Sequence, residues 1–494
     1  MMLSTNLLSA ILNFSICLVI YGMLCKNRRH RLPYPPGPRG LLVAGNMFNM
    51  PKPDEAAKYL AYAKEFGNIY HLSSFGTYII VVSCPKIAND LFSKRSRIYS
   101  GRAPLHMIKD LMGWDFNFAM MDSGILWKDH RKMFENYLKP SKIPCHHTLL
   151  REEIVDFLQN LMNTPHDFAR HIDHLAESSN TRFFYGSPMR RDAAHLRGIA
   201  EKALSSLKVA LVPVKYIPSW FPGAAFKRKA EKWRRITHNM VEYPFRQVCE
   251  AMDNAVASPC FVTNAIHDLR QSEPDADNLD MTKSVVLAFF LSMSLHSDIQ
   301  QIAQEELDKV CSGRLPDFAD RPVLPSSRIS PSKLDWVTLA PILAIPHTTL
   351  KDDIYDGYLI PAGALVIGNT QHVDKCARGT MCGTEHFLQG RYSGTNKTSR
   401  HRKGSILIAA FGYGKRKCPG RFLADAQLFL LVASVLKTYT IKPLPGKRVS
   451  QNPEGLFTTD CITRYPLPFD CLIIPWAEQS AEVLIKGASY ATPQ

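Results

Sequence analysis

The sequence predicts a mainly α-helical protein with a smaller β region, placed behind an N-terminal transmembrane helix. Residues 3–25 form an apolar run long enough to cross the core of a bilayer. Residues 421–436 are apolar on nearly every side of a helix, which predicts a buried helix. Residues 353–363 alternate apolar and polar side chains around an Asp-Gly pair, which is typical of a β-hairpin. The chain has 494 residues and no internal repeat, so we expect one large domain behind the anchor.

The N-terminal anchor comes first in chain order. Four basic residues directly follow the apolar run: Lys26, Arg28, Arg29 and Arg31. By the positive-inside rule, they predict a body that faces the cytosol. A cleaved signal peptide is the alternative, but its positive charge would precede the apolar run. Residues 33–38 are rich in proline and predict a stiff tether, which divides the chain into an anchor (1–25), a tether (26–40) and a body (41–494).

The twelve cysteines are scattered without the spacing of a disulfide framework, as expected in a reducing cytosol. Two cysteines and two histidines could be drawn as a zinc site, although their spacing is wider than that of most structural zinc sites: His372, Cys376, Cys382 and His386. The sequon at Asn396 should stay unglycosylated if the body faces the cytosol.

The net charge of +16 is compatible with a nucleic acid, an anionic membrane or an acidic protein partner. The basic residues are spread along the chain, and no nucleic-acid-binding motif is present. We therefore expect a membrane and protein partners, and no nucleic acid.

A helical stretch covers residues 125–138 and contains Trp127 and Arg131. These two residues are four positions apart, so both face the same side of the helix. An ordinary amphipathic helix with one tryptophan in the core would explain the same pattern.

Residues 411–420 are the most informative stretch of the chain. Gly412 and Gly414 allow a sharp turn and a close approach to a flat partner, and Pro419 suits the first turn of the helix that follows. Cys418 would lie at the positive end of that helix, just after three basic residues, which favours the thiolate over the thiol. A buried thiolate needs a cation, and a haem iron is one such partner. The alternative is a buried cysteine at an ordinary turn before a helix.

The order F-G-x-G-x-R-x-C-P-G in this stretch resembles, position by position, the haem-binding signature of cytochromes P-450. The resemblance implies a cytochrome P-450 fold that binds haem b, with Cys418 as the axial ligand of the iron and Phe411 packed beside the sulfur. It also implies that four side chains hold the haem propionates: Trp127, Arg131, His347 and Arg416.

What the resemblance implies for function is monooxygenation of an apolar small molecule, with electrons supplied by NADPH through the flavin-containing NADPH–cytochrome P-450 reductase. The order of anchor, basic residues and prolines is similar to that of family members held in the endoplasmic reticulum membrane by a single pass. Residues 216–230 resemble the fungal secondary-metabolism branch. Residues 101–124 correspond to the loop that caps the substrate pocket, and their methionines and aromatic residues suit an apolar molecule, although core packing explains them equally well.

The chain departs from the family pattern at three places. Ser332 and Asp335 stand where the family has a Glu-x-x-Arg pair, and His386 replaces the arginine that joins this pair to brace the haem loop. The oxygen-activation motif of the central helix is also incomplete, and Asp280 and Thr282 are its nearest fit and our candidate catalytic residues. The alternative to an active monooxygenase is therefore a non-catalytic or vestigial haem-binding protein, or a misread exon boundary.

Overall fold

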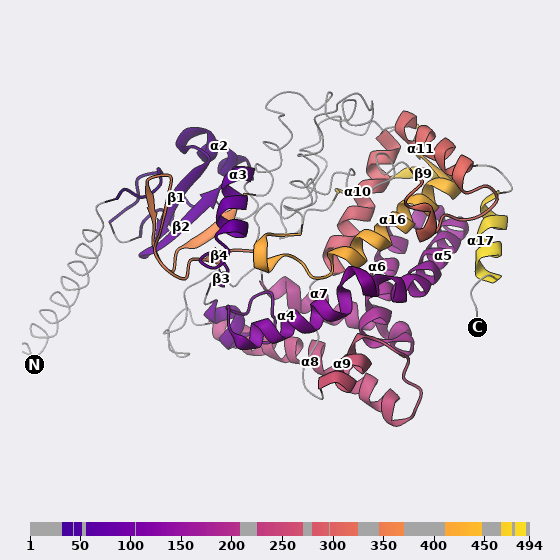
Figure 1. Cartoon of the computed structure of the whole chain (residues 1–494), viewed down its shortest axis with the longest axis horizontal. Coiled ribbons are helices and arrows are strands. Elements are labelled where there is room, and N and C mark those ends of the chain that lie inside the picture. Colours follow the sequence, from indigo (N-terminus) through magenta and orange to yellow (C-terminus); the bar gives the residue numbers. More distant parts are fainter. Residues whose placement is uncertain are drawn as a thin grey trace, which may run out of the picture. The chain divides into compact units, whose positions relative to one another are not determined.

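The structure is a computed structural model of the chain (Figure 1). It describes residues 32–42, 44–51, 56–103, 105–207, 225–269, 279–295, 297–324, 345–369, 411–446, 466–476 and 480–490. The chain divides into two compact units. The β unit comprises Met1–Ala103, Ile342–Arg378 and Tyr413–Lys415, and the helical unit comprises Pro104–Pro341, Gly379–Gly412 and Arg416–Gln494.

The predicted anchor, residues 1–25, lies outside the described residues. None of the helices in the described part of the chain is long and apolar enough to cross a membrane. The described end of the proline-rich tether is docked on the β unit. The backbone N–H of His71 donates to the carbonyl of Pro36 over 2.8 Å, and the ring of Tyr34 stacks on Tyr78 with 4.5 Å between centroids.

The β unit is built around one five-stranded sheet. Its elements in chain order are α2 (Ala56–Phe66), β1 (Ile69–Ser74), β2 (Thr77–Val82), α3 (Pro85–Ala88), η1 (Asn89–Lys94), β3 (Gly101–Arg102), β4 (His347–Thr348), β5 (Asp353–Tyr355), β6 (Tyr358–Ile360) and β7 (Leu365–Gly368). The strand order is β1-β2-β7-β4-β3, and all neighbours are antiparallel except β2 and β7. The last four residues of β2 are buried without alternation, as in a strand covered on both faces.

The predicted hairpin at residues 353–363 is confirmed as β5 and β6. Its turn residues, Asp356 and Gly357, have φ values of 51° and 79°, which suits the Asp-Gly pair. Asp353 fastens the hairpin to the unit, because its carboxylate accepts hydrogen bonds from Arg95 over 2.7 Å and from the Tyr99 hydroxyl over 2.9 Å.

The helical unit contains the long helices and one two-stranded sheet. Its main elements are α4 (Ile125–Leu138), α5 (His147–Asn163), α6 (Phe168–Tyr185), α7 (Ala193–Leu207), α8 (Ala225–Asp253), α9 (Phe261–Leu269), α10 (Leu279–Leu295), α11 (Ser297–Val310), α16 (Arg421–Thr438), β8 (Tyr439–Pro443), β9 (Cys471–Pro475) and α17 (Ser480–Tyr490). Short helices join them: η2 (Met107–Leu111), η3 (Pro140–His146), η4 (Pro165–Asp167), η5 (Ser187–Asp192) and η6 (Phe318–Asp320).

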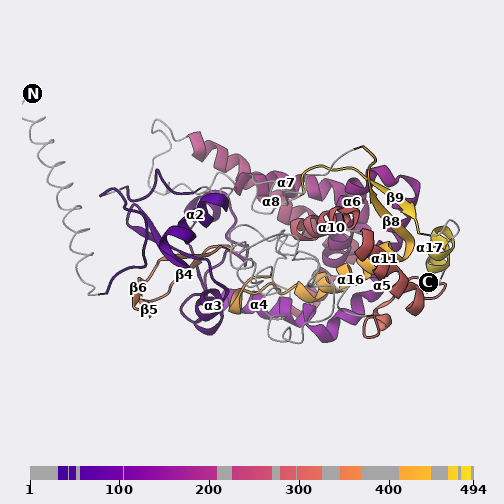
Figure 2. The ribbon, with the colours of Figure 1, turned by 90° about the horizontal axis from the view of Figure 1, so that it is seen from above.

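Helix α16 is the centre of the helical unit. It packs against α5, α10 and α11, and it runs in orange among them in both views (Figures 1 and 2). Every residue from Ala426 to Thr438 is buried. The predicted buried helix at residues 421–436 is therefore confirmed, and it continues to Thr438. Because α16 is held on all sides, the chain segment just before it has a rigid support.

Two buried glutamines of α11 complete the edge of β8. Gln300 accepts a hydrogen bond from the backbone N–H of Ile441 over 2.8 Å and donates to the carbonyl of the same residue over 2.9 Å. Gln304 donates to the carbonyl of Tyr439 over 3.0 Å. The side-chain amides thus satisfy backbone groups that a neighbouring strand would otherwise bond.

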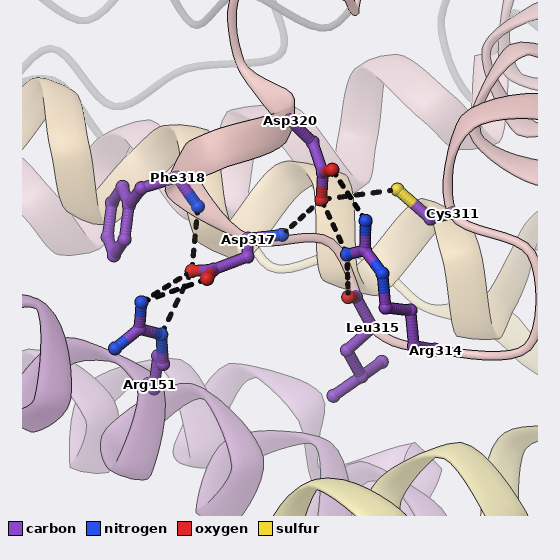
Figure 3. Close-up of polar contacts among 7 residues, drawn as sticks. All are labelled: Arg151, Cys311, Arg314, Leu315, Asp317, Phe318 and Asp320. Atoms are coloured by element: carbon purple, nitrogen blue, oxygen red, sulfur yellow. Dashed lines mark hydrogen bonds and ion pairs between the residues drawn. The ribbon is translucent and has the colours of Figure 1, made fainter.

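Two carboxylates order the loop that follows α11 (Figure 3). Asp320 accepts hydrogen bonds from both terminal nitrogens of Arg314, over 2.6 and 2.7 Å, and from the backbone N–H of Asp317 over 2.8 Å. Asp317 in turn accepts two hydrogen bonds of 2.9 Å from Arg151 on α5. Hydrogen bonding to Arg314 lowers the pKa of the Asp320 carboxyl.

This lowered pKa predicts an acid-sensitive contribution to stability. A carboxyl with a depressed folded-state pKa stabilises the fold above its unfolded pKa of about 3.9, and this contribution disappears as the pH falls through the folded-state value. We expect Asp320→Asn to lower the free energy of unfolding by about 2 kcal/mol at pH 7, with the deficit shrinking toward pH 3. Thermal unfolding of the two proteins at pH 7 and at pH 3 measures this difference in stability. Asp129→Asn, at an exposed position of α4, is the control and should leave the stability unchanged. A loss of stability in Asp320→Asn that is equal at both pH values would contradict the prediction.

Candidate functional site

One backbone hydrogen bond closes the loop before α16. The N–H of Cys418 donates to the carbonyl of Phe411 over 2.8 Å. Gly412 and Gly414 have φ values of 76° and 50°, so both occupy the left-handed region that favours glycine, as predicted. A Cβ on Gly414 would lie 2.1 Å from the carbonyl oxygen of Phe92. The neighbour that requires a glycine at 414 is therefore a backbone carbonyl of the β unit.

Cys418 lies two residues before Gly420, the N-cap of α16. The N–H of Ala424 donates to the carbonyl of Gly420 over 3.0 Å, and this is where the helical bonding begins. Pro419 therefore precedes the N-cap, and its predicted place in the first helical turn is wrong by two positions. The half-buried Cys418 packs against the apolar core of the unit. Cys418 thus lies near the N-terminus of α16, where the helix macrodipole is positive, and the thiolate at this position stays a prediction.

Four basic side chains gather beside Cys418 in the helical unit: Arg131, Arg416, Lys417 and Arg421. Burial lowers the pKa of Arg416 to about 10, with a further lowering by Arg131 that Asp122 opposes. Burial also lowers the pKa values of Lys417 and Arg421. Partly desolvated cations that crowd one another are stabilised by an anion, so this part of the molecule suits a negatively charged group.

Trp127 on α4 also indicates that a negatively charged group, which can accept a hydrogen bond, would be stabilised here. The guanidinium of Arg416 lies over its ring, 4.3 Å from the centroid, in a cation–π contact. The indole N–H of Trp127 is buried and has no acceptor among the residues that the structure describes. An unsatisfied buried donor costs about 1–3 kcal/mol, so a bound acceptor would stabilise it. The rest of the ring packs in an apolar cluster, as the alternative interpretation of this helix expected.

Arg131 lies one turn after Trp127 and reaches the same segment. Its guanidinium donates to the carbonyl of Lys417 and forms a 2.6 Å ion pair with Glu135. The prediction that Trp127 and Arg131 share one side of the helix is confirmed. The structure thus brings together Trp127, Arg131, Arg416 and Cys418, with Phe411 fixed through the backbone of Cys418.

His347 lies in the β unit, on β4, and is buried. Its Nδ1 hydrogen bonds to the carbonyl of Tyr99 over 2.6 Å. The ring of Phe92 lies between His347 and Tyr413, with centroid separations of 4.7 and 5.1 Å. Tyr413 belongs to the cysteine loop, so this aromatic row connects His347 with that loop inside the β unit.

Sequence reasoning missed Arg102 on β3. Its buried guanidinium donates to the carbonyls of Ile345 and Pro346, over 3.0 Å each, and so orders the chain that leads into His347. The available signal was an arginine in a stretch without an acidic residue between Asp90 and Asp110. A buried cation therefore lies next to His347, its partner in the register of β3 and β4.

The remaining predicted site residues are less fully described. The central helix is confirmed as α10, which begins at Leu279, but the side chains of Asp280 and Thr282 lie outside the described set. The same holds for Ser332, Asp335 and His386, for the zinc alternative and for the sequon at Asn396. Among the described residues, no group of three His, Cys, Asp or Glu side chains could hold a metal ion.

The loop predicted to cap a substrate pocket contributes to the core. Met107, Met112 and Trp114 are buried and pack with residues of α7 and α8. Phe118 packs instead with Trp127 and α9. Core packing therefore accounts for these side chains of residues 101–124.

Comparisons with known proteins agree across the chain. Residues 35–258 and 279–464 match the family described as cytochrome P-450. Cytochrome P-450 monooxygenase COX2 of Coprinopsis cinerea is 31% identical, over 93% of this chain and 92% of its own length. Cytochrome P-450 monooxygenase 98 of Postia placenta is 31% identical over 98% of both chains. Tryptamine 4-monooxygenase of Psilocybe cyanescens is 31% identical over 93% of this chain and 96% of its own.

Proposed function

Because the chain belongs to the cytochrome P-450 monooxygenase family, which implies a haem cofactor, we propose that it inserts one oxygen atom from dioxygen into an apolar small molecule. The observation that carries this proposal is the arrangement around Cys418. A half-buried cysteine at a helix N-terminus lies beside crowded basic side chains, one of which covers an indole whose N–H has no acceptor within the described part of the chain.

These residues fit haem b. Cys418 would be the ligand of the iron, and Phe411 would pack beside its sulfur. Trp127, Arg131 and Arg416 would hold the propionates, whose negative charge the basic side chains require. His347, supported by Arg102, would contribute another propionate contact. Bound haem with a thiolate ligand supplies the electron-transfer and dioxygen chemistry that amino-acid side chains lack.

In this proposal, the protein positions the sulfur of Cys418 and supplies side chains that transfer protons. Cys418 lies near the positive end of the α16 macrodipole, and the loop closed by the Phe411 carbonyl fixes its position. At the start of α10 we assign the proton-carrying roles to the Asp280 carboxyl and the Thr282 hydroxyl. A carboxyl followed two positions later by a hydroxyl provides both an acid and a relay for its proton.

We place the enzyme in fungal secondary metabolism, at the endoplasmic reticulum membrane. Matches to enzymes of Coprinopsis cinerea and Psilocybe cyanescens, one of them named for its action on tryptamine, support the first part. The apolar run at residues 3–25 and the basic residues after it support a single-pass anchor with the body in the cytosol. Electrons would come from NADPH through the flavin-containing cytochrome P-450 reductase.

The test is turnover by the full chain in vesicles that also contain the reductase. We expect NADPH-dependent, oxygen-dependent conversion of an apolar substrate, found by screening a panel that includes indoles and terpenes. Peroxide release is measured in parallel because the oxygen-activation motif near Asp280 is incomplete, and haem content because Ser332, Asp335 and His386 depart from the family brace. A matched variant, Ser332→Glu with Asp335→Arg and His386→Arg, restores those charges. If only the restored variant binds haem and turns over, the natural chain is the vestigial haem-binding alternative and our proposal is wrong.

A further inference from the structure

The hydroxyl of Ser123 lies against the guanidinium of Arg416 in the helical unit. Nη2 of Arg416 donates to Ser123 Oγ over 3.2 Å, across 293 positions of sequence. Ser123 directly precedes Gly124, the N-cap of α4, and α4 carries Trp127. The contact therefore connects the start of α4 with the segment that contains Cys418. No sequence motif identifies Ser123, because the contact joins residues that are far apart in the chain.

Two contacts hold the guanidinium of Arg416 from different directions. The ring of Trp127 lies against its face, with 4.3 Å from the guanidinium carbon to the ring centroid. A cation on an aromatic face can still turn in its own plane, because the attraction comes from the whole ring. The hydrogen bond to Ser123 holds one edge of the same group, so it limits this rotation. Both contacts are with uncharged groups, which orient the cation without neutralising it.

The position of the Ser123 hydroxyl is itself fixed. The backbone N–H of Ser123 donates to Oδ1 of Asp122 over 2.8 Å. The N–H of Lys128 donates to the carbonyl of Gly124 over 3.2 Å, so the helical bonding of α4 begins at the residue after Ser123. Ser123 and Arg416 are both half-buried. A hydroxyl that is held at a helix start and partly shielded from water is a stable acceptor for a charged donor.

The orientation of an arginine decides how well it binds a carboxylate. Its five N–H groups form a rigid planar fork, which makes two parallel hydrogen bonds to a carboxylate only when the two groups are suitably aligned. In the proposed haem site, Arg416 is one of the side chains that hold the propionate carboxylates. A guanidinium that is already oriented loses less conformational freedom when a carboxylate binds, so the complex is more stable.

We propose that Ser123 is a positioning residue of the haem site, whose hydroxyl holds Arg416 in the orientation that binds a haem propionate. This inference rests on the proposed haem-binding function and adds a residue that acts through Arg416. Ser123 would affect how long haem stays bound and how the propionate is hydrogen bonded. The iron ligand remains Cys418, so the thiolate spectrum should not depend on Ser123.

The experiment compares variants of the haem-loaded full chain by the rate at which they transfer haem to excess apomyoglobin. We expect Ser123→Ala to lose haem about fivefold faster, as for one hydrogen bond of ordinary strength. Ser123→Thr keeps the hydroxyl and should match the unaltered chain. Resonance Raman spectroscopy of the same proteins reports the propionate bending vibration, which should shift in Ser123→Ala and not in Ser123→Thr. Ser141→Ala, at an exposed position of η3, is the matched control and should change neither quantity.

A double-mutant cycle tests whether Ser123 acts through Arg416. Arg416→Gln should lose haem faster by itself, and adding Ser123→Ala to it should have no further effect. Effects that multiply would show that Ser123 acts independently of Arg416 and would overturn the inference. An unchanged rate in Ser123→Ala would also overturn it, and so would faster loss without a shift of the propionate vibration, which indicates a general loosening of the site.

The same proteins test the proposed function separately. If the unaltered chain shows no red-shifted Soret band after reduction and binding of carbon monoxide, the haem-thiolate function is wrong and this inference is wrong with it. If the band is present in the unaltered chain and in Ser123→Ala, and the two lose haem equally fast, only the role of Ser123 is wrong.

Discussion

Cys418→Ala is expected to abolish the red-shifted Soret band of the reduced, carbon-monoxide-bound protein. The band requires a thiolate on the haem iron, and Cys418 is the cysteine that lies at the N-terminus of α16 among basic side chains. The variant has no sulfur at that position, so any remaining haem would show the spectrum of a weaker ligand. Difference spectroscopy of the purified full chain measures the loss.

Two comparisons make this result specific. Cys471→Ala removes another cysteine of the same core, whose pKa burial raises to about 12, and the band should survive because this thiol stays protonated. Trp127→Phe keeps an aromatic side chain, although a smaller one, and deletes the N–H, so we expect an unchanged band position with roughly tenfold faster loss of haem, as for one hydrogen bond to a charged group. Retention of the band in Cys418→Ala would place the thiolate elsewhere, with Cys376 and Cys382 the candidates.

Gly414→Ala is expected to destabilise the protein by about 3–5 kcal/mol and to prevent stable haem binding. Two costs add together. An L-residue in the left-handed region costs about 1–2 kcal/mol, and the new methyl would lie 2.1 Å from the Phe92 carbonyl oxygen, which forces the backbone to move. Gly414 is four residues from Cys418, so this movement displaces the cysteine loop. Chemical denaturation and the haem content of the purified variant measure both effects.

Gly446→Ala is the matched control. Gly446 has a φ of 80° but nothing within 4 Å of an added Cβ, so its substitution carries the backbone cost alone, about 1–2 kcal/mol. The difference between the two variants isolates the contact with Phe92. Equal destabilisation by the two substitutions would mean that the loop relaxes without cost, and the close approach would then have no structural role.

The features that the sequence predicts well are those set by local patterns. The buried helix after Cys418 and the helix with Trp127 follow from apolar periodicity, and the Asp356-Gly357 turn follows from the backbone that this pair prefers. Each of these signals comes from residues that are close together in the sequence, within one helix or one hairpin. The residues that tolerate a left-handed backbone, including Gly412, could be identified for the same reason.

Other parts of the site depend on residues far apart in the chain. Arg102 meets the carbonyl of Ile345, 243 positions later, and Phe92 lies between His347 and Tyr413; neither pairing leaves a local signal. The methionines of residues 101–124 suit a pocket or a core equally by composition, and only their neighbours on α7 and α8 distinguish the two. Pro419 shows a further limit: the helix begins at Arg421 as predicted, but the proline lies before the N-cap and not in the first turn, because a proline suits both places.

The glutamine pair on α11 has a consequence for association between copies of the chain. Strands with unbonded edges recruit strands from other copies. Gln300 and Gln304 occupy the backbone groups of β8 at Tyr439 and Ile441, so a foreign strand would have to displace two buried amides first. Helix α11 thus covers the edge of β8 as a neighbouring strand would. A helix has no unpaired strand edge of its own to which another chain could add.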